Sequence, residues 1–430
     1  MKTSGILAGL FFMVLAIILL NPFPCQADTP NSPVLVWATG WPAAGRSTAV
    51  FYSVAADTSF GSVAAGYEVR ADLKQGKNWL LVAYDRLGKV SWSTSYDDPS
   101  QGDDVAQAVA IDSMGNIVSA GWAERRDRAS FSDVLVKRMG PKGQLFWSRE
   151  YDGVAHGNDR AYAVAVEMSG AVVVAGVEST RAGSTWLVLK YDAKGILKWG
   201  RTCGGKPGLA ATARAVTVDP AGGIVVAGSE QVGGFNHDWA VRKFDDFGNT
   251  VWSWTLGGAG GGWDEAGAVA PYREGGVLVA GRIQKGGPGT PYSWLVARLS
   301  PSGDVKWTRS GVAAYGDDSR AFAATIDGCG RAVVAGGSIS FSQTGAGQRA
   351  ILYSEYGPEG DLISTWTGTG LANPSAAILG AGMDRSGGVF LVGSGYSGLG
   401  VRNIDAFIAR LERPGCPDFP VDGSPEPGRK

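Results

Sequence analysis

The sequence is poor in the residues that build metal centres and strongly charged binding faces. It holds two histidines and four cysteines in 430 residues, and its 39 Lys and Arg residues nearly balance 40 Asp and Glu residues. A multi-histidine metal site is therefore excluded, and His156 and His237 are each expected to be exposed loop residues. The net charge of −1 provides no basic face for phosphates, so we expect no nucleic-acid partner.

Long apolar runs are also scarce. The one such run, Gly5–Leu20, is shorter than the roughly 20 residues that cross a bilayer as a helix. Lys2 precedes it, and the small residues typical of a cleavage site end at Ala27. Residues 1–27 therefore predict a signal peptide, leaving an extracytoplasmic chain (periplasmic, cell-surface or secreted) with no membrane span. A retained membrane anchor, or a lipid attached to Cys25, is the alternative.

Removal of the signal leaves an odd number of cysteines, Cys203, Cys329 and Cys416. Disulfides persist in exported proteins, so one pair and one free thiol are expected. We predict a Cys329–Cys416 bridge, because both residues fall on turns that the topology below places on one face. Residues 414–430 are rich in proline, lack apolar periodicity and predict an irregular C-terminal tail.

Glycine and tryptophan, in contrast, are abundant, with 65 and 15 residues, and both recur at fixed intervals. The repeating unit is four short strands joined by glycine-containing turns, and no segment outside the signal has a helical period. The second strand of each unit closes with a glycine, at positions 66, 121, 176, 228, 281, 336 and 393. Seven four-stranded units of about 50 residues are typical of the blades of a β-propeller. We therefore predict an all-β, seven-bladed propeller over residues 28–413; a β-sandwich would not explain seven equal units, and a β-helix coil is far shorter.

The ends of the chain predict how the ring closes. The fourth strand of most units carries a tryptophan, but the last unit stops after its third strand, at residues 406–411. The segment Val34–Thr39 matches the missing strand, and Trp37 precedes Trp92 by the repeat's own spacing. We expect this N-terminal strand to complete the last blade, which removes an exposed sheet edge.

The unit resembles two known repeats. Asp85/Gly88/Trp92 and the matching residues of later units look like the tryptophan-docking repeat of pyrroloquinoline-quinone-like (PQQ-like) propellers, with one residue fewer between Asp and Gly. The whole unit, as in residues 159–166 and 115–121, is more similar to the bacterial β-propeller repeat family called SBBP, found in exported proteins. The likeness covers residues 33–412. It implies the fold but no activity, since function lies in sites added to such scaffolds; the vicinal cysteine pair expected of quinone-type enzymes is absent from the sequence.

Aspartates recur just before the first strand of several units, at Asp104, Asp159, Asp264 and Asp318. That strand is innermost in a propeller, so these carboxylates are expected to crowd the mouth of the central channel. They could hold a cation such as calcium, or act as an acid–base pair. The alternative is that each one accepts backbone N–H bonds or pairs with Arg160, Arg214 or Arg320, which occupy neighbouring positions. Repetition favours this scaffold role, and no other cofactor is expected.

Trp41, Trp122 and Trp263 lie outside the repeating tryptophan positions and are expected in loops. The connections between second and third strands and between units vary in length and share one face, where binding residues are usually found. Phe235, Tyr292 and an arginine-rich loop, residues 125–128, should lie there too.

These observations leave three functions open. We expect a monomeric, non-catalytic binding or assembly module that takes a protein or glycan partner in the cell envelope on the loop-rich face. The second hypothesis is an extracytoplasmic polysaccharide hydrolase or lyase that uses Asp264 or Asp318. The third is a purely structural role between envelope components.

Overall fold

The computed structural model describes residues 34–412 except for the short ranges 42–47, 58–60, 71–75, 126–131, 207, 259–260, 285, 287–288, 311–317, 342–346, 369–376, 385–387 and 397–403. The described residues form 28 β-strands and no helix. The all-β prediction is therefore confirmed. No helix long and apolar enough to cross a membrane occurs in this part of the chain.

Five sheets contain four antiparallel strands each, paired in chain order. The first two are formed by β6 (Asp104–Ile111), β7 (Ile117–Ala123), β8 (Asp133–Met139) and β9 (Leu145–Tyr151), and by β10 (Arg160–Val166), β11 (Val172–Thr180), β12 (Gly183–Tyr191) and β13 (Leu197–Cys203). The third is formed by β14 (Ala211–Val218), β15 (Ile224–Gly233), β16 (Asn236–Phe244) and β17 (Thr250–Leu256). The last two are formed by β18 (Glu265–Pro271), β19 (Val277–Gln284), β20 (Tyr292–Leu299) and β21 (Val305–Ser310), and by β22 (Asp318–Ile326), β23 (Ala332–Phe341), β24 (Gly347–Tyr356) and β25 (Leu362–Gly368).

A sixth sheet has eight strands and brings the two ends of the chain together. It contains β2 (Thr48–Asp57), β3 (Gly61–Val69), β4 (Lys77–Tyr84), β5 (Val90–Tyr96), β26 (Ala377–Met383), β27 (Val389–Tyr396), β28 (Ile404–Glu412) and β1 (Val34–Trp41). Its two halves are joined by one parallel pair, Thr48 with Ile404. The N-terminal strand β1 lies antiparallel to β28, from Val34 opposite Glu412 to Trp41 opposite Ala406. The first strand therefore pairs with the last, and it extends two residues beyond the predicted end at Thr39.

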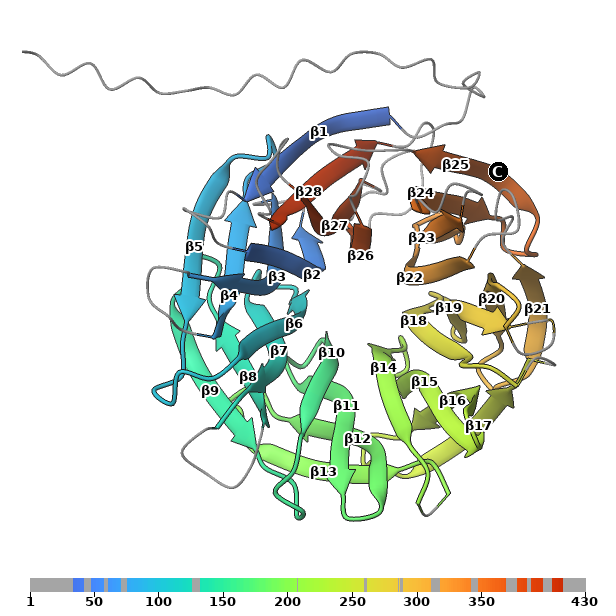
Figure 1. Ribbon diagram of the computed structural model, residues 1–430, viewed down its shortest axis with the longest axis horizontal. Coiled ribbons are helices and arrows are strands. Elements are labelled where there is room, and N and C mark those ends of the chain that lie inside the picture. Colours follow the sequence, from blue (N-terminus) through green and yellow to red (C-terminus); the bar gives the residue numbers. More distant parts are fainter. Residues whose placement is uncertain are drawn as a thin grey trace, which may run out of the picture.

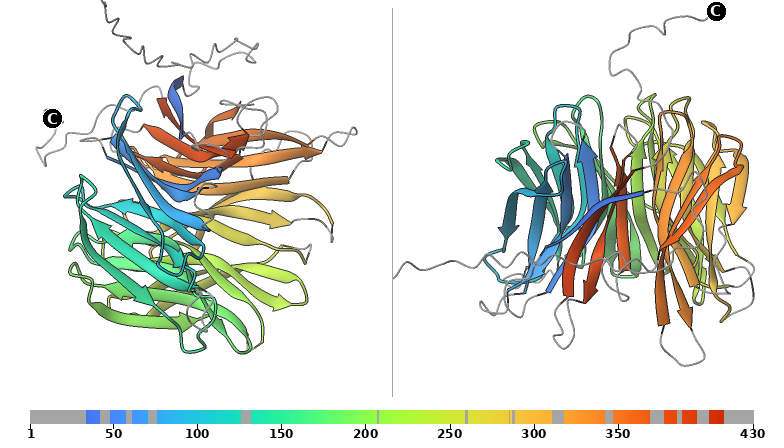
Figure 2. Two further views of the ribbon diagram at one scale, coloured as in Figure 1. Left: turned by 60° about the vertical axis from the view of Figure 1, so that its left-hand side comes forward. Right: turned by 90° about the horizontal axis from the view of Figure 1, so that it is seen from above.

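The sheets stand side by side around a central axis, as in a β-propeller (Figure 1). The first strand of each unit lies nearest the axis and the fourth lies outermost, so that β2, β6, β10, β14, β18, β22 and β26 surround the centre. Seen from the edge, the strands run from one face of the ring to the other (Figure 2). The short turns that join first to second strands and third to fourth strands therefore share one face, and the other connections share the opposite face.

The core lies between neighbouring sheets. The second and third strands are covered on both sides and carry near-continuous apolar runs; every residue of β8 is buried, for example. The outer strand β5, in contrast, alternates between exposed and half-buried residues. The third-strand tryptophans are among the largest fully buried side chains: Trp79, Trp186, Trp239 and Trp294. The repeating tryptophans of the third strand therefore pack between sheets, as predicted.

The outer-strand tryptophans contact the turn of the neighbouring unit. Trp147 on β9 donates a 3.1 Å hydrogen bond from Nε1 to the carbonyl of Ala193, in the β12–β13 turn of the next unit. A Cβ on the turn glycine, Gly195, would lie 2.8 Å from the Trp147 ring, and its φ of 77° is the left-handed conformation that favours glycine. Trp37 on β1 makes the same bond to the Arg86 carbonyl, at 3.1 Å. The N-terminal strand thus docks on the next unit as the other outer strands do.

The glycine that closes each second strand allows a close backbone contact. A Cβ added to Gly228 would lie 2.1 Å from the carbonyl oxygen of Thr212, a distance that no real side chain tolerates. The same overlap, at 1.8–2.1 Å, occurs at all seven repeat glycines. Each of them lies opposite a β-bulge in the first strand, where one extra residue stands out of register, such as Arg214 between Ala213 and Ala215.

We predict that Gly228→Ala destabilises the protein by about 1–3 kcal/mol or more, because the added methyl group must push β14 and β15 apart. Gly233→Ala, in the same strand, is the matched control, since a Cβ there meets no atom within 4 Å. Urea unfolding of both variants measures the difference. A loss at Gly228 no larger than at Gly233 would contradict this role.

Candidate functional site

A cavity of about 430 Å³ lies on the axis and is lined by all the inner strands. Each bulge contributes its extra residue to the wall, and these residues are Tyr52, Gln107, Tyr162, Arg214, Gly267, Phe322 and Leu379. Every one of them is half-buried, whereas the residue before it is buried. The bulge thus turns its extra side chain towards the axis, while the residue before it is buried; residues further along each inner strand also contribute to the wall.

The cavity is polar at one end and apolar further in. Each inner strand starts at the loop-rich face, so residues near its start lie at that end and later residues lie deeper. The early positions supply charged groups such as Glu265 and Arg320, while the later ones supply Val109, Val164 and Val269. The polar end is therefore the mouth on the loop-rich face.

Three arginines and one glutamate line this mouth. Arg214, on β14, forms an ion pair with Glu265, and Nη2 of Arg282, on β19, lies 3.2 Å from the other oxygen of the same carboxylate. Arg320, on β22, lies over the ring of Tyr292 at 6.0 Å. We call Arg214, Glu265, Arg282 and Arg320 the mouth cluster.

Electrostatics confirm that the mouth cluster is crowded with positive charge. Burial lowers the pKa of Arg282; Glu265 opposes this shift, while the guanidinium groups of Arg320 and Arg214 add to it. One carboxylate does not balance three guanidinium groups, so the mouth carries a local positive charge although the whole chain is nearly neutral.

Trp263 provides an aromatic surface beside the mouth cluster. Its ring is stacked on the imidazole of His237, with centroids 4.3 Å apart and planes 4° apart. The side chain of Trp263 remains 41% exposed, and the guanidinium carbon of Arg282 lies 5.9 Å from its ring. The backbone N–H of Trp263 donates a 3.0 Å bond to the hydroxyl of Tyr292. Trp263 is therefore held in place while one side of it stays open to solvent.

His237 lies in β16 and is buried, so the expectation of an exposed loop residue was wrong for it. The parallel bridge to Trp263 explains the burial: the N–H of His237 donates to the carbonyl of Gly262 at 2.9 Å, and the N–H of Asp264 donates to the carbonyl of His237 at 3.0 Å. Burial lowers the pKa of the imidazole, which favours its neutral form.

Trp122 lies on the other side of the mouth. It lies within β7, not in a loop as predicted, because the second strand pairs with β6 as far as Ala123. Its ring meets Tyr162 edge-on at 6.4 Å, and Tyr162 in turn lies under the guanidinium of Arg214, at 4.3 Å. A series of side-chain contacts thus links Trp122 to the mouth cluster and so to Trp263.

Trp41 does not belong to this site. The sequence placed it in a loop, but it ends the outermost strand β1, opposite Ala406, and packs half-buried against a core cluster that includes Phe51 and Ile408. The extra two residues of pairing between β1 and β28 explain the difference.

The predicted aspartates bind backbone rather than facing the cavity. Asp264 accepts N–H bonds from Gly258 at 2.6 Å and Gln284 at 2.7 Å. Asp159 accepts from Gly153 and Ser179 in the same way, at 2.5 and 2.9 Å. These bonds tie each inner strand to the loops on either side of it.

The other two aspartates have the same kind of contact. Asp104 accepts from the N–H of Asp98 at 2.5 Å, and Asp318 accepts from the N–H of Tyr292 at 2.7 Å. The four aspartates do not line the cavity, contrary to the expectation that they crowd the channel mouth; each instead accepts at least one backbone N–H bond beside it.

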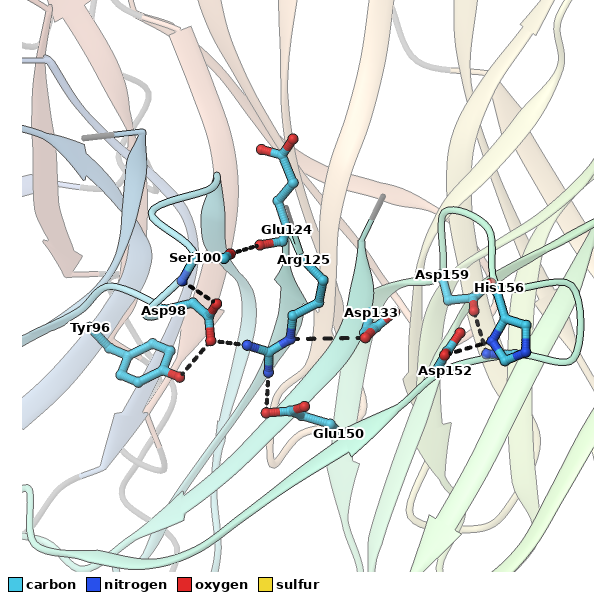
Figure 3. A network of polar contacts seen from close by, with 11 residues as sticks. Tyr96, Asp98, Ser100, Glu124, Arg125, Asp133, Glu150, Asp152, His156 and Asp159 are labelled. Carbon is cyan, nitrogen blue, oxygen red and sulfur yellow. Dashed lines mark hydrogen bonds and ion pairs between the residues drawn. The ribbon is translucent and has the colours of Figure 1, made fainter. Parts of the chain in front are cut away.

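A buried ionic network surrounds Asp104. The guanidinium of Arg125 lies among the carboxylates of Asp98, Glu150 and Asp133, as Figure 3 shows. Arg125 was expected to be exposed in a loop, but it is buried, since these carboxylates compensate its charge. The remainder of the arginine-rich loop, from residue 126, lies outside the described residues.

Burial, together with the carboxylates of Asp97 and Asp103, raises the pKa of Asp104 to about 8, against the opposing effect of Lys137. Burial raises the pKa of Asp159 to about 6, although its two backbone N–H bonds oppose the shift. Burial raises the pKa of Asp264 as well. These shifts follow from burial in the scaffold and do not identify an acid–base pair.

The cysteine prediction is tested at one residue. Cys329 is disulfide-bonded and Cys203 is free, while Cys416 lies outside the described residues. The pairing of Cys329 with Cys416 stays a prediction. Within the described ranges, no three His, Cys, Asp or Glu side chains gather as metal ligands, and the suggestion of calcium is not carried further.

Sequence reasoning missed most of the mouth cluster. Arg282 and Glu265 were not identified, and Arg214 and Arg320 appeared only as possible partners of aspartates. A usable signal was present in the repeat: the residue after the alanine of the first strand varies strongly, from Gln107 to Arg214, between positions that hardly change. Where the residue type varies inside an otherwise constant unit, the fold does not require a particular side chain at that position.

Comparison with known proteins supports the fold. No protein-family model matches the chain, and no curated protein matches it. Among solved structures, the chain is similar to polysaccharide lyase Uly1, with a TM-score of 0.55 and 9% identity over 88% of this chain and 99% of that one. It is also similar to a protein of unknown function from Dyadobacter fermentans, with a TM-score of 0.50 and 13% identity over 89% and 99% of the two chains. At these identities the likeness shows the fold alone.

The raised pKa of Asp104 predicts how stability depends on pH. Between about pH 6 and 7.5 the native carboxyl keeps a proton that the unfolded chain has lost, so the free energy of unfolding should fall as pH rises. The contribution is at most about 1.4 kcal/mol per pH unit for one proton. Asp104→Asn, which is neutral at every pH, should remove this part of the slope in urea unfolding. Equal slopes in the variant and the parent would show that native Asp104 is already ionised. Asp159 is present in both proteins, so its contribution to the pH dependence cancels in this comparison.

Proposed function

We propose that the protein is a non-catalytic binding module that takes a glycan at the mouth of its central cavity, on the loop-rich face. The observation that carries this proposal is the open face of Trp263, held by stacking on His237 directly beside the mouth cluster. Binding sites of small molecules combine apolar and aromatic walls with a few convergent polar groups. Tyr162, Gln107 and the arginines supply such polar groups here.

The shape of the site favours a glycan over a protein partner. A cavity of about 430 Å³ lies within the roughly 300–1,000 Å³ of small-molecule sites. The recess is also walled by side chains from all the inner strands, which suits a ligand that enters it rather than a surface that covers it.

Catalysis by the aspartates is not part of this proposal. A glycoside hydrolase of the common type would need two carboxyl groups beside the substrate, and a lyase that uses these aspartates would need them to face the substrate. Asp264 and Asp318 accept backbone N–H bonds outside the cavity lining, so we assign them to the scaffold.

We further propose that the scaffold has seven blades and that the N-terminal strand completes the last one. The two halves of the eight-stranded sheet are joined by a single pair of strand residues, which suits two separate blades, β2 to β5 and β26 to β28 with β1, that pack side by side. The bond from Trp37 to the Arg86 carbonyl supports the closure, because it repeats the contact that joins other neighbouring units.

In this proposal the protein acts outside the cytoplasm. Its partner is a glycan of the cell envelope, and it binds this glycan as a monomer. The disulfide at Cys329 supports an oxidising compartment. The signal peptide, residues 1–27, lies outside the described residues, and the resemblance to SBBP repeats remains a hypothesis.

The test is binding of the mature domain to a glycan array, followed by titration of the best glycan. Trp263→Ala should weaken binding more than about tenfold, because truncating an aromatic hot-spot residue costs about 2 kcal/mol. Phe247→Ala is the matched control, since Phe247 is 73% exposed on the opposite, short-turn face. The proposal fails if the parent binds no glycan, or if Trp263→Ala binds as tightly as Phe247→Ala.

A further inference from the structure

We propose that the glycan bound at this mouth carries an anionic group, a carboxylate or a sulfate ester, and that Arg320 and Arg282 hold it. This inference rests on the proposed function of the same site and names its ligand class. Two observations support it: the excess of positive charge among the residues that line the mouth, and the guanidinium N–H groups of these two side chains that have no hydrogen-bond partner within the described part of the chain.

Charge in the mouth is not compensated by the protein. The lining contains three guanidinium groups, of Arg214, Arg282 and Arg320, but one carboxylate, that of Glu265. Both oxygens of Glu265 are already used, one by Arg214 and one by Arg282. The carboxylate of Asp264 also acts on Arg282 electrostatically, but it does not line the cavity, so a further negative charge within the lining would come from a ligand.

Arg320 is the clearest unmatched group. In the part of the chain that the structure describes, no carboxylate forms an ion pair with it, and its neighbour is the ring of Tyr292. Buried or half-buried arginines elsewhere have partners: Arg138 pairs with Asp112, and Arg242 pairs with Glu230. Arg149 and Arg160 have no carboxylate partner, but they donate hydrogen bonds to the Gly195 carbonyl and the Ser132 hydroxyl. A half-buried guanidinium without a partner is costly, so its position in a cavity points to a ligand.

Arg282 offers a second donor at the same place. Its side chain is 12% exposed, and its Nε–H has no hydrogen-bond partner among the described residues. Tyr292 lies between the two arginines, 4.9 Å from the guanidinium carbon of Arg282 and 6.0 Å from that of Arg320. The planar fork of a guanidinium matches the oxygens of a carboxylate or a sulfate, and an anion between two of them relieves their repulsion.

The remainder of the site suits an uncharged sugar ring. Trp263 offers an apolar face next to Arg282, and alanine and valine line the deeper wall. A neutral glycan could use this surface but would desolvate Arg320 without compensating its charge. The site should therefore discriminate by charge as well as by shape.

Three probes of equal length test the inference by calorimetric titration of the mature protein: a galacturonate oligosaccharide, a sulfated galactose oligosaccharide and the neutral galactose oligosaccharide. We expect at least one anionic probe to bind about tenfold or more tightly than the neutral one, and this advantage to shrink as salt is added. The carboxylate and sulfate arms show which group is preferred.

Arg320→Gln should remove that advantage, with a loss of about tenfold or more for the anionic probe and little change for the neutral one. Arg320→Lys, which keeps the charge but loses the fork, should fall between them. Lys198→Gln, an equal loss of charge at an exposed residue of the outer strand β13, is the control and should bind like the parent. Thermal unfolding of each variant confirms that the fold is kept.

Equal binding of neutral and anionic probes, or an anionic advantage that survives in Arg320→Gln, overturns the inference. If the neutral probe binds and depends on Trp263, the glycan function stands while its anionic assignment falls. If none of the three probes binds, the anionic assignment falls, while the glycan function is decided by the array.

Discussion

The close approach of two backbones at each repeat glycine is the contact on which the rest of this structure depends. A Cβ at any of these glycines would lie 1.8–2.1 Å from a carbonyl oxygen of the inner strand, so only glycine lets the second strand come so near. Opposite the glycine, the inner strand accommodates one extra residue as a bulge, as at Tyr162 and Arg214. The same contact thus fixes the pairing of the strands and turns one side chain towards the axis.

In this arrangement the residues that the fold requires are different from the residues that vary at the site. Glycines, buried strands and docked tryptophans repeat around the ring, whereas the residues that line the cavity, among them the bulge residue, change from unit to unit. The result is an asymmetric cavity: one side carries Arg214, Glu265, Arg282 and Arg320, and the other carries residues such as Leu379. Trp263 joins the charged side through its contact with Arg282. A repetitive scaffold can in this way hold one specific ligand site.

The sequence predicted those features that repeat. The period of the glycines indicated the four-stranded units, and the spacing of Trp37 from Trp92 indicated that the first strand pairs with the last. Predictions failed where pairing or burial depends on a partner distant in the chain. Trp41 and Trp122 belong to strands whose ends are set by their neighbours, Arg125 is buried by three carboxylates, and the aspartates are occupied by backbone donors that no local pattern reveals.

Thiol reactivity at the bulges tests the central claim most directly. In a mature chain with Cys203→Ser, single cysteines replace a bulge residue, Gln107 or Leu379, and the buried residue before it, Ala106 or Ile378. We expect Gln107→Cys and Leu379→Cys to react rapidly with a small methanethiosulfonate reagent in the native protein, whereas Ala106→Cys and Ile378→Cys should react only after unfolding. Equal rates at paired positions would contradict the claim that the bulge turns its extra residue into the cavity and leaves the preceding residue in the core.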